Sequence, residues 1–456
     1  MRLILFALLF ILFFLLSFTI IPGVDTFWQV KTGEVIVKQG IPHRDIFSYT
    51  AQGEKWVVHE WLSDVIFYKI HKIDPNLLLI FKGVIIALAF LILAFICLEE
   101  LALLPLLILL LSATASRIFF DVRPQIFSYL FFSLLLFLLY RKHLLFIPPV
   151  FLLWCNLHSG FILGLLVLFL WTMEAVWKGE EKGKWIFLFS LSFLLTFINP
   201  NSWHLYQHAF DLLGWKEVQD VIVEWLSPNF HRLDVLPFEV LIFAFFFSFI
   251  FAPNIRIIDL ALGVILVHFS LQAVRHIPLF AILATPLMVF NFRNVSQVLE
   301  ERMGRITKPI ALLFPFLLSL SQVAALPSYK DMFSVFVQYT EHFFPLINVK
   351  KIKLEEGNIF NEYKWGGYLI FNCYPQKKVF VDGRAEVYKR KGVLNDYFFI
   401  WNASSNWESL KKKYNITLFL LDKEAPLSKV LKERKDYRLI GEDLVSYLFR
   451  YEPKKR

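Results

Sequence analysis

Residues 76–98 read NLLLIFKGVIIALAFLILAFICL, an apolar run that carries one charged side chain, Lys82. A helix that crosses a bilayer needs roughly 20 mostly apolar residues, so this run predicts a membrane-spanning helix. The rest of the chain has the same character, because 57% of its 456 residues are apolar and only 19% are charged. Soluble chains are about 45–50% apolar and about 25% charged. The sequence therefore predicts a polytopic α-helical membrane protein.

Composition and motifs exclude several other classes of protein. Intrinsic disorder requires low hydrophobicity, and this chain has a mean hydropathy of +0.56. A disulfide scaffold is excluded because the only cysteines are Cys97, Cys155 and Cys373, an odd number without metal-ligand spacing. The sequence contains no Walker A loop, dinucleotide-binding glycine fingerprint or HExxH zinc motif. No nucleic acid partner is expected.

Further apolar segments lie on both sides of residues 76–98. They are 3–22, 101–118, 124–140, 144–157, 160–177, 185–199, 236–253, 257–273, 277–292 and 309–326. Together they predict about 11 membrane spans. The segment 144–157 is short and contains Pro148-Pro149, so it is expected to be tilted or broken.

The basic residues of the short loops predict the orientation of the spans. Lys and Arg collect in 141–143, in 178–184, at Arg256 and in 293–308, which places these loops and the N-terminus on the cytoplasmic side. The C-terminal segment then lies outside, as do the long segments 23–75 and 200–235. We expect a bacterial inner-membrane protein with a periplasmic or extracellular C-terminal domain.

The C-terminal segment differs in composition from the rest of the chain. Residues 327–456 hold 24 Lys/Arg against 16 Asp/Glu, whereas the first 326 residues are almost neutral. Such a basic surface contacts anionic lipid head groups or is simply solvated. Its pattern is that of an α/β domain, with expected strands at 378–381, 416–421 and 444–451 and helices at 407–414 and 428–436. The predicted domains are 1–326, with the large outer loop 23–75, and 327–456.

Polar residues gather at the outer ends of the predicted spans. They are Asp25, His59, Glu60, Arg117, Asp121, Arg123, Gln125, Asn156, His158, Glu224, Arg275 and His276. Each has an ordinary alternative: the arginines could snorkel to lipid phosphates, the histidines could end helices, and the two first-loop acids could cap helices. However, the positive-inside rule disfavours arginine on the outer side, and an anionic ligand would compensate it.

This set of residues suits the transfer of a group from a phosphate leaving group. A carboxylate acts as general base on an acceptor hydroxyl, and the expected carboxylates are Asp25 and Glu60. Arginine donates bidentate hydrogen bonds to phosphate. The expected phosphate-binding residues are Arg117, Arg123, Arg275 and His276. Because nucleotide sugars are absent outside the cell, the donor would be lipid-linked.

Several stretches resemble the GT-C superfamily of polytopic glycosyltransferases, and more closely an uncharacterised bacterial branch of it. They are Asp25-Thr26-Phe27-Trp28-Gln29 with Thr32-Gly33, Pro42 to Thr50, His59-Glu60-Trp61-Leu62, Arg123-Pro124-Gln125-Ile126-Phe127-Ser128, Asn156-Leu157-His158-Ser159-Gly160, Asn199-Pro200, Asn358 to Leu369 and Val379 to Glu386. The resemblance covers nearly the whole chain. It implies a polyprenyl-phosphate sugar as donor.

The resemblance also assigns roles to residues. Asp25 matches the first-loop catalytic carboxylate, and Glu60 is similar to a second first-loop carboxylate of aminoarabinose-transferase-like members. Asp121-Val122-Arg123 lies where other members have a second acidic pair, but Arg123 replaces one acid. This departure leaves the dependence on a divalent metal open, and no cofactor is assigned. Asp382 and Arg384 remain site candidates without a transferred role, the alternative being an ordinary turn.

We therefore expect a glycosyltransferase that moves a sugar from a polyprenyl-phosphate donor to a lipid, glycan or protein acceptor. Two alternatives stay open. One is a glycan ligase or polymerase that uses a diphosphate-linked oligosaccharide. The other is a transporter, flippase or assembly subunit for a lipid-linked glycan, which would carry polar groups through the bilayer rather than at one face.

Overall fold

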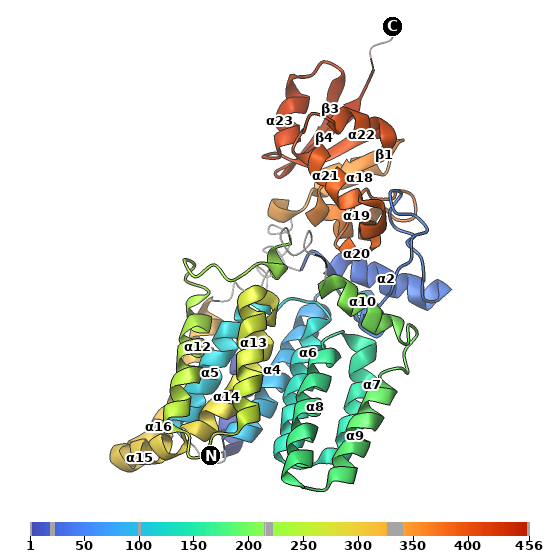
Figure 1. The fold of residues 1–456 in the computed structure, drawn as a ribbon. Coiled ribbons are helices and arrows are strands. Elements are labelled where there is room, and N and C mark those ends of the chain that lie inside the picture. The colour runs from blue at the N-terminus through green and yellow to red at the C-terminus, as the bar shows by residue number, and fades with distance from the viewer. Residues whose placement is uncertain are drawn as a thin grey trace. The chain divides into compact units, whose positions relative to one another are not determined.

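The computed structural model describes residues 2–18, 23–98, 102–213, 215, 222–325 and 341–453. The chain divides into two compact units (Figure 1). The first, here called the helical unit, comprises Met1–Thr19 and Asp74–Leu326. The second, called the α/β unit, comprises Ile20–Ile73 and Pro327–Arg456.

The helical unit contains a helix within every apolar segment that the sequence predicts as a span. The α-helices are α1 Arg2–Leu16, α4 Leu77–Cys97, α5 Leu103–Ser116, α6 Gln125–Tyr140, α7 Ile147–Leu157, α8 Phe161–Lys178, α9 Lys182–Leu195, α10 His204–Leu213, α12 Leu236–Ser248, α13 Ile257–Gln272, α14 Ile277–Asn291, α15 Arg293–Met303 and α16 Thr307–Ala325. Short 3₁₀ helices are η1 Arg117–Phe119, η2 Leu144–Phe146, η3 Val223–Trp225, η4 Phe249–Phe251, η5 Val274–His276 and η6 Gly304–Ile306. Parts of the predicted spans 3–22, 101–118 and 309–326 lie outside the described residues.

The helices are shorter than the prediction of 11 spans requires. Within the described ranges, three are long and apolar enough to cross a membrane: Leu77–Cys97, Phe161–Lys178 and Val274–Asn291. A fourth is added if the bent pair Arg293–Met303 and Thr307–Gln322 forms one span. Several other apolar segments are interrupted, as where α12 gives way to η4 and where η2 precedes α7. The structure confirms a helical protein with several apolar helices that are able to cross a membrane, but it does not confirm the predicted number of 11 spans.

Helix α14 is the best-buried element of the helical unit. Nearly all of its side chains are buried, and it packs against α4, α5, α6, α12 and α13. The Thr285 hydroxyl donates to the Ala281 carbonyl of its own helix at 2.7 Å, and its oxygen lies 2.6 Å from the Ser112 hydroxyl of α5. These two hydroxyl groups are thus satisfied within the protein, as an apolar surrounding requires.

The α/β unit combines two helices from the first part of the chain with the C-terminal elements. Its elements are α2 Thr26–Gln39, α3 Trp61–Ile73, α18 Leu346–Ile352, β1 Asn358–Asn361, η7 Tyr363–Trp365, α19 Gly366–Cys373, α20 Ala385–Tyr388, η8 Lys389–Lys391, α21 Val393–Trp401, α22 Trp407–Lys413, β2 Ile416–Asp422, α23 Pro426–Glu433, β3 Tyr437–Glu442 and β4 Ser446–Tyr451. The strands form one sheet in the order β1-β2-β4-β3. Strands β1 and β2 are parallel, and the other two pairs are antiparallel.

The α/β character of the C-terminal segment is confirmed, with one strand misplaced. Strand β2 contains the predicted strand 416–421 and is buried along most of its length, as its continuous apolar run indicates. The expected strand at 378–381 is wrong, because these residues do not join the sheet. Val379 instead forms an isolated bridge with Ser48, which lies in the first part of the chain.

The predicted division of the chain needs a related correction. Residues 23–75 were expected to belong to the membrane domain as its outer loop, but Ile20–Ile73 belongs to the α/β unit. Tyr49 donates its hydroxyl to the Ile359 carbonyl at 3.1 Å, and helix α2 packs against α19. The reason is that aromatic and hydrogen-bonding groups of this segment find their partners in the C-terminal segment, more than 300 residues away along the chain.

Candidate functional site

The predicted site residues fall into two groups, one in each unit. The α/β unit holds Asp25, His59, Glu60, Asp382 and Arg384, and the helical unit holds Arg117, Asp121, Arg123, Gln125, Asn156, His158, Glu224, Arg275 and His276.

Asp25 lies immediately before α2 and is buried, with 8% of its surface exposed. Its side chain does not cap the helix, although the residue stands at the N-cap position. Oδ1 instead accepts a hydrogen bond from the indole Nε1 of Trp28 at 2.9 Å. A Cβ atom added to Gly383 would lie 2.0 Å from the same oxygen, so only glycine fits against this carboxylate. Asp25 is thus held in one orientation by groups from both ends of the chain.

Glu60 lies immediately before α3, and α2 orients its side chain as well. Gln29 Nε2 donates to Glu60 Oε2 at 3.0 Å, and the other carboxylate oxygen lies 3.4 Å from His59 Nε2. Gln29 follows Trp28 directly in α2, so neighbouring residues of one helix hold the two predicted catalytic carboxylates.

His59 lies between two carboxylates. Its ring nitrogen Nδ1 is 3.4 Å from the Val57 carbonyl, and a ligand atom of the ring lies within 4.8 Å of a Glu386 carboxylate oxygen. Burial lowers the pKa of His59, but the carboxylate of Glu60, assisted by Glu386, more than offsets this, and the pKa is raised. Burial also raises the pKa of Glu386. The arrangement favours a positive charge at this imidazole.

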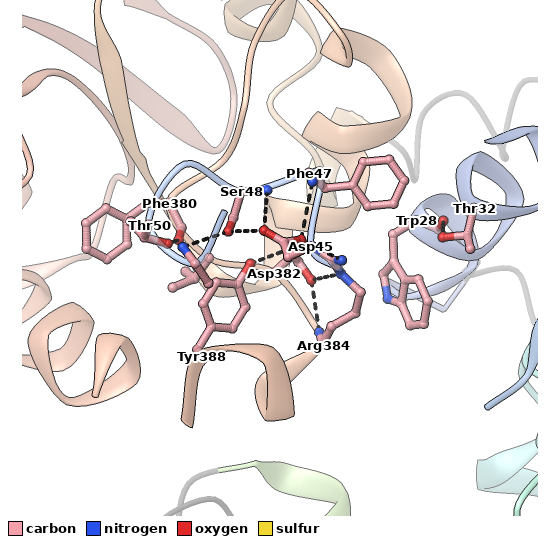
Figure 2. A network of polar contacts seen from close by, with 12 residues as sticks. Trp28, Thr32, Asp45, Phe47, Ser48, Thr50, Phe380, Asp382, Arg384 and Tyr388 are labelled. Atoms are coloured by element: carbon pink, nitrogen blue, oxygen red, sulfur yellow. Dashed lines mark hydrogen bonds and ion pairs between the residues drawn. The ribbon is translucent and has the colours of Figure 1, made fainter. Parts of the chain in front are cut away.

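Arg384 is the centre of a fully buried ion network (Figure 2). Its Nε and Nη2 donate to the two carboxylate oxygens of Asp382 at 2.8 and 2.6 Å, and its Nη1 lies 2.8 Å from Asp45 Oδ1. The guanidinium carbon stands 4.9 Å from the ring centre of Phe47 and 4.4 Å from that of Trp56. Burial lowers the pKa of Arg384, but the two aspartates outweigh it and hold the pKa well above its usual value.

The two aspartates of this network have further donors. Asp45 Oδ2 accepts from the amide and hydroxyl of Ser48 at 3.1 and 2.6 Å, and Oδ1 accepts from the Phe47 amide at 3.2 Å. Asp382 accepts from the Tyr388 hydroxyl and from the Arg384 amide. The last bond is that of an Asx turn, so the turn expected for Asp382 and Arg384 is present. Because these acceptors are satisfied, the network serves to hold residues 45–48 to residues 382–388.

The segment Asp382-Gly383-Arg384-Ala385-Glu386, here called the DGRAE segment, connects the network to the predicted carboxylates. Gly383 packs against Asp25, and Glu386 lies beside His59, which in turn contacts Glu60. The C-terminal part of the chain therefore contributes to the surroundings of both first-loop acids, which the sequence prediction had placed in another domain.

In the helical unit, three predicted residues meet around η3 and η5. Arg123 forms an ion pair with Glu224, and the Arg275 guanidinium carbon lies 4.8 Å above the ring centre of Trp225. The Val274 amide donates to the Leu226 carbonyl at 3.0 Å, which holds the two short helices together. The structure thus brings Arg123, Glu224 and Arg275 together, although they are far apart in sequence.

Tyr129 lies at the middle of this group and was not predicted. Only 2% of its surface is exposed. The charges of Asp121, Arg123 and Arg275 act on its hydroxyl, and Gln125 forms a hydrogen bond with it. Four predicted residues therefore surround one phenol on α6. Tyr129 follows Gln125 by one helical turn, and this spacing places the two side chains on the same face of a helix, which the sequence alone could have indicated.

Lys82 is a second residue that the sequence analysis did not assign. It lies in α4, has 1% of its surface exposed and has Asp121 as an electrostatic partner. The sequence alone could have indicated Lys82, since it is the single charged residue in the run 76–98. An ionisable side chain inside a membrane-spanning helix is a functional candidate by default. We call Lys82, Asp121, Arg123, Glu224 and Arg275 the cationic cluster, because three of its five charges are positive.

His158 and Asn156 hold helices together. The Gly160 amide donates to His158 Nδ1 at 3.1 Å, and Ser128 Oγ lies 2.6 Å from the same nitrogen. Asn156 Nδ2 donates to the Ile198 carbonyl at 2.9 Å, which ties α7 to the chain after α9. These contacts give both residues a structural role, which was the alternative for His158.

Arg117 and His276 differ in their relation to the cluster, since the His276 ring contacts that of Trp225, with 6.3 Å between the ring centres. Arg117 begins η1 and is exposed. His276 ends η5, where its Nδ1 is 3.2 Å from the Phe269 carbonyl. The phosphate-binding role expected for them stays a prediction.

Comparison of the chain with protein-family models and with curated proteins found no match. The class of this protein therefore follows from its fold and its sites alone. It is a membrane-associated α-helical protein, with apolar helices able to cross a bilayer, that carries an α/β unit in which buried carboxylates are held by a long-range ion network.

Proposed function

We propose that this protein is a glycosyltransferase that moves a sugar from a polyprenyl-phosphate donor to a hydroxyl of a lipid, glycan or protein acceptor. The observation that carries the proposal is the environment of Asp25. Its carboxylate is buried, is oriented by Trp28 and is not used as a helix cap. A carboxylate held in this way suits a general base, which needs a fixed position near the proton it removes.

In the proposed reaction, Asp25 removes the proton of the acceptor hydroxyl as its oxygen attacks the anomeric carbon of the sugar. The bond between that carbon and the phosphate oxygen breaks, and polyprenyl phosphate leaves with the bonding electrons. Attack from the face opposite the leaving group inverts the anomeric configuration. Cations that neutralise the departing phosphate lower the barrier, because charge develops there in the transition state.

The cationic cluster supports a monophosphate donor. Its three cations and two acids leave one net positive charge. A polyprenyl-phosphate sugar is a phosphodiester with one negative charge, whereas a diphosphate-linked oligosaccharide carries two. The charge balance therefore favours the glycosyltransferase over the ligase or polymerase that uses a diphosphate donor.

Donor binding tests the role of the cluster. Arg123→Gln and Arg275→Gln are each expected to weaken the binding of a polyprenyl-phosphate sugar by about 1.5–3 kcal/mol, the net value of a hydrogen bond to a charged group. The affinity can be measured by titration of the full-length protein in detergent. Arg293→Gln is the control, since this arginine follows the C-terminal end of α14, whereas Arg275 precedes its N-terminal end. Wild-type affinity in both cluster variants would contradict the role and leave snorkelling as the explanation.

We further propose that the α/β unit lies outside the cytoplasmic membrane of a bacterium. Ser405 is exposed in this unit, and the three native cysteines are buried, so Ser405→Cys introduces a single reactive thiol. An impermeant maleimide is expected to label it in intact spheroplasts. Glu180→Cys, in the basic connection between α8 and α9, should be labelled only after lysis. The opposite labelling pattern would reverse the proposed orientation.

A further inference from the structure

We propose that the α/β unit binds the surface of an anionic phospholipid bilayer through α18 and the turn between β3 and β4. The binding surface, here called the α18 surface, carries three aliphatic and three basic side chains, all exposed. They are Ile347, Lys350, Lys351, Lys353, Leu354 and Leu444. The inference goes beyond the proposed function, because it assigns a binding partner to a part of the chain that the proposed reaction does not use.

Helix α18 has one buried face and one exposed face. Its buried residues are Asn348, Val349 and Ile352. On the other face, Ile347 is 54% exposed and Leu354 is 86% exposed, and the exposed Lys350 and Lys351 lie between them in sequence. The Leu354 amide donates to the Lys351 carbonyl at 2.9 Å, which continues the turn beyond the helix end. Because these residues are spaced by three, four and seven positions, they share one face.

The turn between β3 and β4 adds a third exposed aliphatic side chain, Leu444, which is 59% exposed. The carboxylate of Asp443 fixes this turn, since its Oδ1 accepts from the amides of Val445 and Ser446 at 3.2 and 2.9 Å. Asn348 of α18 donates its backbone amide to Asp443 at 3.3 Å and its side-chain amide to Ser446 Oγ at 2.8 Å. The helix and the turn therefore form one continuous, well-held surface.

The α18 surface has a net positive charge. Its exposed lysines are Lys350, Lys351 and Lys353. Two nearby acids are neutralised by other cations, because Glu355 pairs with Arg450 and Glu442 pairs with Lys423. The exposed Glu356 offsets only one of the three lysines. The surface is thus complementary to an anionic partner.

An anionic bilayer matches both kinds of side chain in the α18 surface. Aliphatic side chains enter the boundary between head groups and acyl chains, and lysines beside them contact the anionic head groups. Each lysine near such a surface increases binding by about fivefold. A small anionic ligand would use the lysines but would leave Leu354 and Leu444 in water, so it fits the surface less well.

The covalent connections of the α/β unit keep it close to a bilayer. Its helix α3 ends at Ile73, and α4, which is long and apolar enough to cross a membrane, begins at Leu77. The chain passes between the two units again after Leu326. Such tethering gives the lipid a high effective concentration, so even a weak contact is occupied. Three aliphatic side chains and three lysines are therefore sufficient, although they would recruit a free domain only poorly.

The test measures the immersion of a spin label in the full-length protein, reconstituted into nanodiscs of equimolar phosphatidylcholine and phosphatidylglycerol. Leu444→Cys introduces a single reactive thiol, because the three native cysteines are buried. A nitroxide there should be shielded from a water-soluble nickel chelate and accessible to oxygen, which concentrates in lipid. Ser405→Cys, at an exposed position of the same unit, is the control and should remain accessible to nickel.

Substitutions in the Leu444→Cys background test the α18 surface itself. The ratio of lipid-immersed to water-exposed label should fall by about fivefold for each of Lys350→Gln, Lys351→Gln and Lys353→Gln. The matched control carries Lys412→Gln, Lys429→Gln and Lys435→Gln, which remove the same charge from other exposed positions of the unit. This control should keep the ratio unchanged. An unchanged unfolding temperature in both sets verifies that the fold is intact.

Several results would overturn the proposal. One is a label at residue 444 that is as accessible to nickel as the label at residue 405. Another is an equal loss of immersion in the two sets of lysine variants, and a third is equal immersion in nanodiscs of pure phosphatidylcholine. Shielding from nickel without access to oxygen would indicate cover by protein, such as a second copy of the chain, in place of lipid. None of these measurements depends on sugar transfer, so they leave the proposed function to its own test.

Discussion

Asp25→Asn is expected to reduce the rate of sugar transfer by about 10²–10⁴-fold, the usual loss when a general base is removed. Asparagine keeps the size of the side chain and still accepts the hydrogen bond from Trp28, so the fold and donor binding should be retained. The measurement is turnover with a polyprenyl-phosphate sugar, together with donor affinity in the same preparation. A fall in turnover at unchanged donor affinity is the signature of a residue that acts in the chemical step.

Glu60→Gln is the necessary comparison, because Glu60 is the other first-loop acid that is expected to act as the base. If Asp25→Asn keeps full activity and Glu60→Gln abolishes it, the base has been assigned to the wrong carboxylate. If both variants keep full activity, the glycosyltransferase proposal fails, and a transporter or an assembly subunit becomes the better explanation.

Arg384→Met should destabilise the α/β unit by about 3–5 kcal/mol, the cost of removing one partner from a buried ion pair. The guanidinium has no exposed surface and lies between Asp45 and Asp382, so its loss leaves two buried carboxylates without their cation. Hydrogen exchange can measure this in the full-length protein. Amides of β2 and the DGRAE segment should exchange faster, whereas those of α14 in the helical unit should not change.

Arg438→Met provides the control for Arg384→Met. Arg438 pairs with Glu452 at 3.0 Å, but 61% of its side chain is exposed. Exposed ion pairs contribute about 0–1 kcal/mol, so this variant should be close to the wild type. Equal exchange rates in the two variants would show that the buried network does not hold the unit together. Arg384→Lys keeps the charge but loses the planar guanidinium, so its amide exchange rates should lie between those of Arg384→Met and Arg438→Met.

Local sequence patterns predicted much of the architecture. An apolar run needs no distant partner to be recognised, because bilayer thickness and helix rise alone set its length. Helices α4 and α8 therefore lie close to the expected bounds. The strand run 416–421 was recognisable for a similar reason, since buried strands are continuously apolar. The exact number of spans was beyond this approach, because 3₁₀ segments such as η4 shorten helices without an obvious change in composition.

The candidate sites were predictable only in part. Asp25, Glu60, Arg123 and Arg275 stood out because charges at the ends of apolar segments are expensive and rare. Asp45 did not stand out, since an aspartate in a loop is ordinary until its partner is known. That partner, Arg384, is more than 300 residues away and became visible only when the chain was folded.

The sequence by itself determined that this protein is rich in apolar helices, that its C-terminal part is α/β and that acids and arginines stand at the ends of its apolar segments. These properties depend on composition and on short periodic patterns, which each segment carries alone. Only the tertiary structure decided that residues 20–73 belong with the C-terminal part, that Gly383 packs on Asp25 and that Glu386 lies beside His59. The physical reason is that such contacts depend on the complementary shapes and charges of distant segments, which no local pattern contains.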